Sequence, residues 1–200
     1  MQKLFLSIII PTHNNARTFA LTLLDIRHHL ERFDFRHEII IVDDHSHDGT
    51  LEVARRFATL MQPIQILSYA GPCGILGAIR YGARVARGNY FFIFPATGEA
   101  MFDEIEKMLP RVASNQTQIV FGARRRILIS WEFFLTKIRS FLAGILLRDP
   151  ATTYFLIRSD VVTSAFPRLT TSSFPLAFEL ARLARTLGYC YAEIPLSTHM

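Results

Sequence analysis

Residues 38–50 read Glu38-Ile-Ile-Ile-Val-Asp-Asp-His-Ser-His-Asp-Gly-Thr50, an unbroken apolar run followed at once by acidic and turn-forming residues. The apolar residues occupy consecutive rather than alternate positions. This is typical of a strand buried on both faces, as in a parallel sheet covered by helices. In open α/β sheets, ligands bind beyond the carboxyl ends of the strands. The residues that follow this strand are therefore candidates for ligand contacts.

The same alternation of apolar run and helical segment continues on both sides of this stretch. Strands are predicted at residues 4–10, 38–42, 64–68, 90–94 and 118–121, and helices at residues 17–30, 51–61, 77–86 and 101–112. Strand–helix alternation at this spacing indicates α/β units with right-handed crossovers. We expect an α/β fold around a mostly parallel sheet.

The second half of the chain has a different pattern. Residues 130–147 form a long, mostly apolar helical segment, followed by a predicted strand at 153–158, a helix at 174–187 and a strand at 189–194. The sequence contains no internal repeat and no linker-like segment. We therefore expect one domain over residues 1–200, with a nucleotide-binding half at 1–122 and an acceptor-side half at 123–200.

The composition narrows the class of protein. Half of the 200 residues are apolar and a fifth are charged, which excludes a disordered or low-complexity chain. Only two cysteines occur, so a disulfide framework is excluded and a reducing, cytoplasmic compartment is expected. The net charge of +5 favours anionic partners, although a solvated basic face explains it equally well.

The acidic loop after the strand at 38–42 is the most informative motif. Asp43 and Asp44 stand where carboxylates can accept hydrogen bonds from ribose hydroxyls or from a base edge. Residues 48–50 supply a turn and the expected cap of the next helix. His45 and His47 leave a metal site open, because imidazole and carboxylate both bind zinc or manganese.

Other motif classes are not indicated. The sequence has no G-x-x-x-x-G-K-[ST] and no G-x-G-x-x-G after the first strand, so a P-loop protein and a Rossmann-type oxidoreductase are not expected. It also has no recognisable nucleic-acid-binding motif, so nucleic acid is not an expected partner.

Several segments, in order along the chain, resemble the family 2 glycosyltransferases of the GT-A fold. They are Ser7-Ile-Ile-Ile-Pro-Thr-His-Asn14, the acidic loop at 41–50, the Gly-rich stretch at 74–88, Phe121-Gly-Ala-Arg124, Asp149-Pro-Ala-Thr-Thr-Tyr-Phe155 and Glu193-Ile-Pro-Leu196. The order is similar to that of the dolichyl- or polyprenyl-phosphate sugar synthase branch, and it covers nearly the whole chain. The resemblance implies a three-layer α/β/α sandwich.

The resemblance also implies an activity and a set of site residues. The activity is transfer of a hexose from a nucleoside-diphosphate sugar to a polyprenyl or dolichyl phosphate or a related acceptor. Arg124 and Asp149 are implied as catalytic residues. The implied nucleotide-sugar contacts are Pro11, His13, Asn15, Val42, Asp43, Asp44, Thr97, Lys137 and Arg139.

The segment at 131–147 bears on where such a protein works. It interleaves bulky apolar side chains with Lys137 and Arg139, which suits an interfacial helix near anionic lipid. An ordinary core helix fits the same pattern. A peripheral position at the inner face of a membrane is therefore expected beside the cytoplasmic one, and a homo-oligomer stays open.

One departure from the family pattern bears on the mechanism. The family's Asp-x-Asp, which holds the divalent cation on the sugar diphosphate, falls at Pro95-Ala-Thr97, where no carboxylate is present. Metal assistance is worth several kcal/mol of transition-state stabilisation. We therefore expect no firmly bound cofactor and at most weak Mg²⁺ or Mn²⁺ binding, with Glu99 as the candidate ligand. An impaired paralogue that binds a nucleotide sugar as a sensor or scaffold stays open beside the enzyme.

Overall fold

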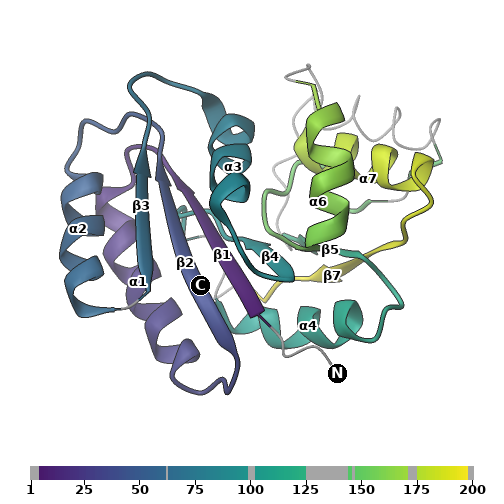
Figure 1. Ribbon diagram of the computed structural model, residues 1–200, viewed down its shortest axis with the longest axis horizontal. Coiled ribbons are helices and arrows are strands. Elements are labelled where there is room, and N and C mark those ends of the chain that lie inside the picture. The colour runs from purple at the N-terminus through teal and green to yellow at the C-terminus, as the bar shows by residue number, and fades with distance from the viewer. Residues whose placement is uncertain are drawn as a thin grey trace. The chain divides into compact units, whose positions relative to one another are not determined.

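The computed structural model describes residues 5–61, 63–98, 102–124, 144–145, 147–170 and 175–197. The chain forms two compact units, which divide between Asp103 and Glu104. Each unit has its own strands and helices (Figure 1). The single domain with halves meeting at residue 122 stays a prediction.

The first unit is built on four parallel strands. They are β1 (Phe5–Thr12), β2 (Arg36–Asp43), β3 (Ile64–Ser68) and β4 (Tyr90–Ile93). Their order is β3-β2-β1-β4, and all three pairings are parallel. The chain adds β2 and β3 on one side of β1 and β4 on the other. Such a reversal is the point at which α/β sheets bind ligands, at the carboxyl ends of the strands.

Helices cover both faces of these four strands. Helices α1 (Ala16–Leu30) and α2 (Thr50–Leu60) lie on one face, and α3 (Gly74–Val85) lies on the other (Figure 1). Residues Ile8, Ile9 and Ile10 are all 0% exposed. Burial of each such side chain contributes about 1.5–3 kcal/mol to stability. The prediction of a parallel sheet from consecutive apolar residues is confirmed for this unit.

The second unit has three described strands. Strand β5 (Ile119–Ala123) pairs in parallel with β7 (Tyr191–Pro195) and antiparallel with β6 (Phe155–Arg158). Helix α4 (Ile105–Ala113) packs on β5 and β6, while α6 (Ser159–Ala165) packs on β6 and against α7 (Leu176–Thr186). Short 3-10 turns occupy Phe102–Glu104 and Phe166–Arg168. Across both units the described pairings are mostly parallel, as expected.

The predicted elements are confirmed with shifted ends, apart from two differences. Helix α6 follows β6 directly and was not expected from the sequence. The helix predicted at 130–147 falls mostly outside the described residues, and at Gly144, Ile145 and Leu147 the prediction is wrong. Gly144 has a φ of +67°, a left-handed conformation that a continuing helix does not contain.

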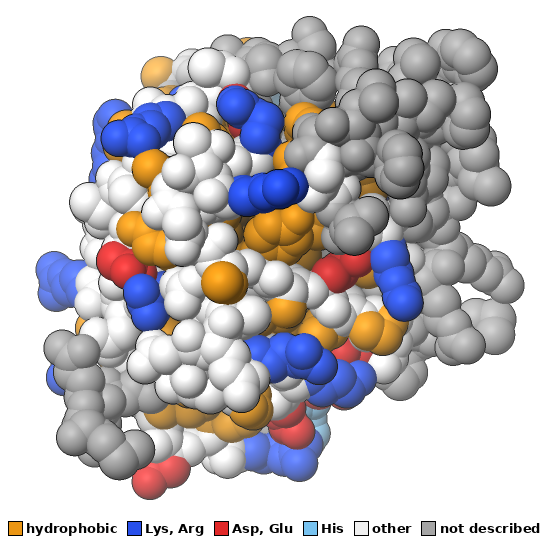
Figure 2. Space-filling model, turned by 90° about the vertical axis from the view of Figure 1, so that its right-hand side faces the viewer, with side chains coloured by type: hydrophobic (Ala, Val, Ile, Leu, Met, Phe, Trp, Pro, Cys, Tyr) orange, Lys and Arg blue, Asp and Glu red, His pale blue; other side chains and the backbone are white. Residues whose placement is uncertain are grey.

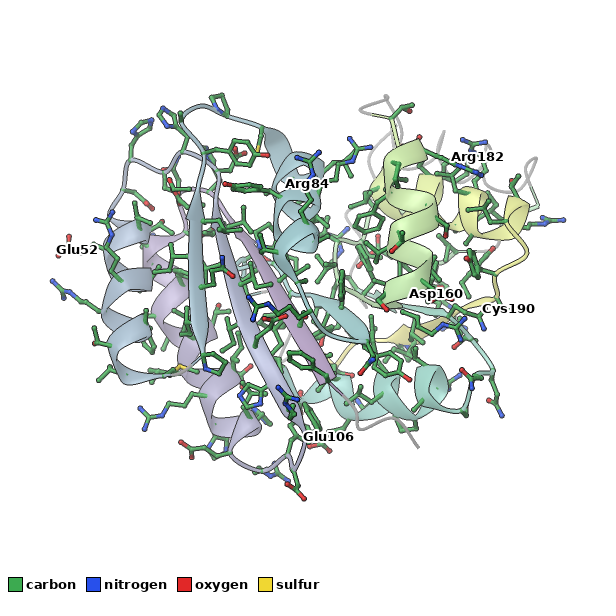
Figure 3. All side chains as sticks on the ribbon, viewed as in Figure 1. Glu52, Arg84, Glu106, Asp160, Arg182 and Cys190 are labelled. Carbon is green, nitrogen blue, oxygen red and sulfur yellow. The ribbon has the colours of Figure 1, made fainter. Side chains whose placement is uncertain are left out.

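The outward faces of the helices carry charged side chains. Figure 3 labels Glu52 of α2, Arg84 of α3, Glu106 of α4, Asp160 of α6 and Arg182 of α7, all of which are exposed. Charged outer faces and apolar inner faces are the pattern of helices packed on a sheet. Among the described residues, none of the helices has the length and apolar character required to cross a bilayer.

We predict that Gly88→Ala destabilises the first unit. A Cβ at this position would lie 2.7 Å from the backbone oxygen of Phe5 and 2.7 Å from the backbone nitrogen of Ser7. Backbone atoms of a central strand cannot move aside cheaply, so we expect a loss of about 1–3 kcal/mol in urea unfolding. The matched control is Gly71→Ala, whose Cβ would meet nothing within 4 Å. We expect the control to change stability by less than about 0.5 kcal/mol. Equal losses in both variants would contradict the close approach.

Candidate functional site

The strands β1 and β2 end side by side at the carboxyl edge of the first unit. Pro11 pairs with Val42, and Thr12 pairs with Asp43. The backbone N–H of Asp44 donates to the carbonyl oxygen of Thr12 at 2.9 Å, which extends the pairing by one residue. The loops after both strands therefore start from neighbouring positions. The expected residues of these two loops are brought together by this register.

The carboxylate of Asp44 binds the first turn of α3. Its Oδ1 accepts the backbone N–H of Cys73 at 2.6 Å, and its Oδ2 accepts that of Gly74 at 2.9 Å. Burial alone would raise the pKa of Asp44, but the N–H groups of Cys73 and Gly74 lower it below its ordinary value of 3.8. The same burial, together with the Asp44 carboxylate, raises the pKa of the Cys73 thiol to about 12, so the thiol stays protonated. Asp44 therefore acts as a remote cap, and α3 begins one turn earlier than predicted.

The imidazole of His13 is fixed between the two loops. Its Nδ1 lies 2.6 Å from the carbonyl oxygen of Asp44, and its Nε2 lies 3.1 Å from the side-chain nitrogen of Asn14. A carbonyl oxygen only accepts, so the hydrogen of the ring is on Nδ1, and Nε2 accepts from Asn14. The side-chain oxygen of Asn14 accepts the backbone N–H of His47 at 2.9 Å. The backbone N–H of Asn14 donates to the hydroxyl oxygen of Ser46 at 3.0 Å. His13 is exposed, and both nitrogens of its ring are engaged by the two loops.

Asn15 and Asp48 connect the starts of the first two helices. The Oδ1 of Asn15 accepts the N–H of His13 at 2.9 Å, and the N–H of Asn15 donates to the hydroxyl of Thr50 at 2.9 Å. Asp48 accepts the backbone N–H groups of Ala16 and Thr50 at 3.0 and 3.1 Å, and these residues begin α1 and α2. The hydrogen bond from the Thr50 hydroxyl lowers the pKa of Asp48. The expected capping role of residues 48–50 is thus carried by the Asp48 side chain.

Among the expected contact residues that the structure describes, Asp43 has a buried oxygen with an unfilled position. Its side chain is 2% exposed, and its Oδ2 accepts the N–H of Ser46 at 3.2 Å. Its Oδ1 is buried and has no hydrogen-bond partner among the described residues. An unsatisfied buried acceptor costs about 1–3 kcal/mol, and more for a charged group. A ligand that brings an N–H or O–H to this oxygen would recover that cost.

The loop after β4 lies beside the loop after β1. The N–H of Phe94 donates to the carbonyl oxygen of Ile9 at 3.0 Å, and the hydroxyl of Thr18 donates to the carbonyl oxygen of Ala96 at 2.9 Å. Thr97 is exposed at the tip of the loop. The loop therefore stands at the strand-order reversal between β1 and β4.

The described residues offer no ligand set for a divalent cation. The loop at 95–97 has a proline, an alanine and a threonine in place of two carboxylates. Within the described ranges, no three His, Cys, Asp or Glu side chains are grouped as a metal site would require. His45 and His47 instead form an edge-on ring pair with centroids 4.5 Å apart. Glu99, the candidate ligand, lies outside the described residues, as do Lys137 and Arg139.

The second unit brings Arg124 and Asp149 together. Asp149 is 0% exposed, and its carboxylate accepts Nε of Arg124 at 2.7 Å and Nη2 at 3.1 Å. A two-point contact of this kind fixes the plane of the guanidinium group. Arg124 remains about one-third exposed. The expected catalytic residues thus form one ion pair, with the carboxylate inside and the cation at the surface.

Glu193 is a residue of this cluster to which the sequence assigned no role. Its two carboxylate oxygens accept the backbone N–H groups of Arg148 at 2.7 Å and Asp149 at 2.9 Å. It thereby fixes the backbone from which the Asp149 side chain projects. The signal in the sequence was a single acidic residue within β7, the strand Tyr191–Pro195. Its partners, 44 and 45 positions away, were not predictable from that signal.

Basic side chains are spread over the face of the molecule in Figure 2. Lys and Arg stand there among apolar and acidic groups rather than in one continuous stripe. A continuous stripe is the usual electrostatic footprint of nucleic-acid binding. The described part of this face does not have that pattern.

Comparison with known proteins gives a family and a fold. Residues 7–168 match the family described as glycosyl transferase family 2. The dolichyl-phosphate beta-glucosyltransferase of Saccharomyces cerevisiae is 26% identical over 227 residues, which cover 99% of this chain and 68% of the relative. Its counterpart in Dictyostelium discoideum is 26% identical over 220 residues, covering 97% of this chain and 66% of the relative. The chain thus spans about two thirds of the length of these relatives.

Solved structures share the fold at low sequence identity. Glucosyl-3-phosphoglycerate synthase from Mycobacterium tuberculosis, in complex with Mg²⁺ and uridine-diphosphate, has a TM-score of 0.69 at 14% identity, covering 100% of this chain and 72% of that one. The mannosyltransferase PcManGT from Pyrobaculum calidifontis, in complex with GDP-Man and Mn²⁺, has a TM-score of 0.69 at 18% identity, covering 98% of this chain and 55% of that one. The expected α/β fold of the GT-A type is confirmed.

We predict that the stabilising effect of Asp44 depends on pH. Its pKa is lowered in the folded state, so its contribution is present above the ordinary value of 3.8 and is lost as the pH falls through the folded pKa. Asp44→Asn should cost about 1–3 kcal/mol at pH 7, because one N–H of the α3 turn then faces an amide NH₂ group. In urea unfolding, the difference from the parent should hold above the ordinary pKa of 3.8 and shrink as the pH falls below it. Asp34→Asn, at an exposed carboxylate, is the control. A difference that stays constant as the pH falls would contradict the assignment.

Proposed function

Because this chain belongs to glycosyl transferase family 2, we propose that it transfers a hexose from a nucleoside-diphosphate sugar to dolichyl phosphate or a related polyprenyl phosphate. The similarity to dolichyl-phosphate beta-glucosyltransferases over nearly the whole chain supports this acceptor and makes glucose the first hexose to test. The same similarity does not favour the alternative of an impaired sensor or scaffold.

The observation that carries the donor half of the proposal is the unpaired Oδ1 of Asp43. It is a buried carboxylate oxygen at the carboxyl edge of a parallel sheet, beside the strand-order reversal. A ribose hydroxyl or a base N–H supplies the donor that this oxygen lacks. The face of the His13 ring supplies an apolar platform for the base. Asp44 and Asn15 hold these two loops in place. Pro11 and Val42 are paired strand residues just before the loops, and both are buried, so their side chains support the loops rather than contact the nucleotide as expected.

The acceptor half of the proposal follows from the chemistry of a phosphate nucleophile. A phosphate monoester carries about −1.5 to −2 charges at pH 7, so its oxygen attacks without first losing a proton to a general base. The new bond joins that oxygen to the anomeric carbon, and the bond from that carbon to the nucleoside diphosphate breaks. The electron pair of the broken bond leaves with the diphosphate.

This chemistry suits the pairing of Arg124 with Asp149. The carboxylate of Asp149 is fully buried and both of its oxygens bind Arg124, so it is not placed to take a proton from a substrate. We assign Arg124 the catalytic role of binding a substrate phosphate. Asp149 is then its positioning partner, and a fixed cation needs no reorganisation as charge develops. Lys137 and Arg139 are further candidates for phosphate contacts.

The cation requirement of the proposed reaction is expected to be weak. Structural neighbours bind UDP with Mg²⁺ and GDP-Man with Mn²⁺. The described residues at 95–97 do not fit such an ion, since hard divalent cations require several carboxylate or carbonyl oxygens. No step is therefore assigned to a metal. Because the proposed acceptor is a membrane lipid and the low cysteine content suits a reducing compartment, we propose that the reaction takes place at the cytoplasmic face of a membrane.

We predict transfer of glucose from UDP-glucose, or of mannose from GDP-mannose, to dolichyl phosphate in detergent by the purified chain. Asp43→Asn should raise the KM for the nucleoside-diphosphate sugar about tenfold. The new NH₂ group would face an N–H or O–H of the ligand, and the lost hydrogen bond to a charged group contributes about 1.5–3 kcal/mol. The acceptor KM should not change. Glu106→Gln, at an exposed carboxylate, should behave as the parent. Nucleotide binding without transfer to any polyprenyl phosphate would contradict the enzyme and favour the sensor.

We also predict a weak metal dependence. Replacing Mg²⁺ or Mn²⁺ by EDTA should change nucleotide affinity by less than about threefold, since most of the coordination is absent. The double variant Pro95→Asp with Thr97→Asp should become metal-dependent in the same calorimetric titration. Fast parental transfer that EDTA abolishes would contradict this prediction and would point to Glu99 as the ligand.

A further inference from the structure

Helix α1 contacts the loop after β4 through the hydroxyl of Thr18. This hydroxyl lies 2.9 Å from the carbonyl oxygen of Ala96 and 3.3 Å from that of Asn15, one turn earlier in its own chain. The second contact alone would satisfy a threonine at the start of a helix. The shorter bond to Ala96 is therefore not required by the helix, and it fixes the backbone of the loop.

A second contact between α1 and the same segment involves Asp25. Its Oδ2 accepts the backbone N–H of Phe102 at 2.7 Å, and its Oδ1 lies 3.1 Å from Nδ1 of His29. The Asp25 side chain is only 14% exposed, and a carboxylate so placed is costly unless it is hydrogen-bonded. Asp25 lies seven residues after Thr18 on α1, and its bond to Phe102 links the start of the 3-10 turn at Phe102–Glu104 to this helix.

Aromatic packing closes the ends of this segment. Phe102 is 0% exposed, and its ring lies edge-on to Phe94 at 5.7 Å and to Phe92 at 5.5 Å between centroids. Residues Phe94 and Phe102 therefore form a fixed base. Between them, the described residues 95–98 are held by Thr18 at the carbonyl oxygen of Ala96.

We propose that Thr18 and Asp25 are positioning residues: Thr18 holds the backbone at Ala96 and Asp25 holds it at Phe102, so that residues 95–98 stay against the diphosphate of the donor. The inference rests on the proposed function. With no carboxylates at 95–97, the polar groups of the described tip are its backbone groups and the hydroxyl of Thr97. Groups of this kind stabilise charge effectively only when they are held in place beforehand. The two contacts from α1 supply that constraint.

The test compares a nucleoside diphosphate with its own nucleoside. Thr18→Val keeps the β-branched shape and removes the hydroxyl, and Thr18→Ser restores it. We expect Thr18→Val to weaken the binding of UDP or GDP by about five- to tenfold in calorimetry, which is the effect expected from the loss of one hydrogen bond. Binding of uridine or guanosine should stay within about twofold, because the nucleoside contacts lie on the loops after β1 and β2. Thr18→Ser should return the diphosphate affinity to that of the parent.

A matched control lies one turn further along the same helix. The hydroxyl of Thr22 donates to the backbone oxygen of Thr18 at 3.1 Å and is buried, so Thr22→Val removes the same group without touching the loop. Asp25→Ala should repeat the diphosphate-specific loss and Asp25→Asn should not, which keeps the test valid if one variant fails to fold. Unchanged UDP affinity in Thr18→Val and Asp25→Ala, or equal losses for UDP and uridine, would overturn the inference while leaving the proposed function in place. A parent chain that binds no nucleoside diphosphate would overturn both.

Discussion

The side chain of Asp44 and the backbone of the same residue join three elements of the first unit. Its N–H continues the pairing of β2 with β1, its carbonyl oxygen accepts the ring of His13, and its carboxylate accepts two N–H groups of α3. The positive end of the α3 dipole favours this negative charge. The start of α3 and one of the two contacts that orient the His13 ring therefore depend on Asp44, while Asn14 supplies the other contact of the ring.

Asp43 and Asp44 show how neighbouring identical residues take different roles. Successive side chains at the end of a strand point to opposite sides, so the two carboxylates meet different surroundings. That of Asp44 is satisfied by protein N–H groups, whereas one oxygen of Asp43 is buried without a partner in the described part of the chain. The sequence grouped both as ligand contacts. The structure separates a residue that builds the site from one that still has an acceptor to offer.

The parts of the fold that local sequence determines were predictable, and the long-range contacts were not. The strands were predictable because consecutive apolar residues such as Ile39–Val42 have no other stable place than between two layers of helices. The start of α3 was missed because its cap comes from Asp44, 29 and 30 positions earlier, rather than from an adjacent Ser, Thr or Asp. Likewise, Arg124 and Asp149 were each expected from the resemblance, but their pairing across 25 positions is a property of the folded unit. No pattern of spacing in the sequence encodes it.

In the proposed reaction, the loop at 95–98 and Arg124 would each meet negative charge, by different means. A leaving diphosphate and an attacking phosphate both carry negative charge, which a family Asp-x-Asp would offset by holding a dication. Here the described loop at 95–98 has no such carboxylates but is held by Thr18, while Arg124 is held by a fully buried carboxylate. A guanidinium fixed in this way carries one positive charge, fewer than a divalent ion, but it does not dissociate. In the proposed reaction, the chain therefore exchanges part of the charge stabilisation of a metal for cations and dipoles that its own fold keeps in position.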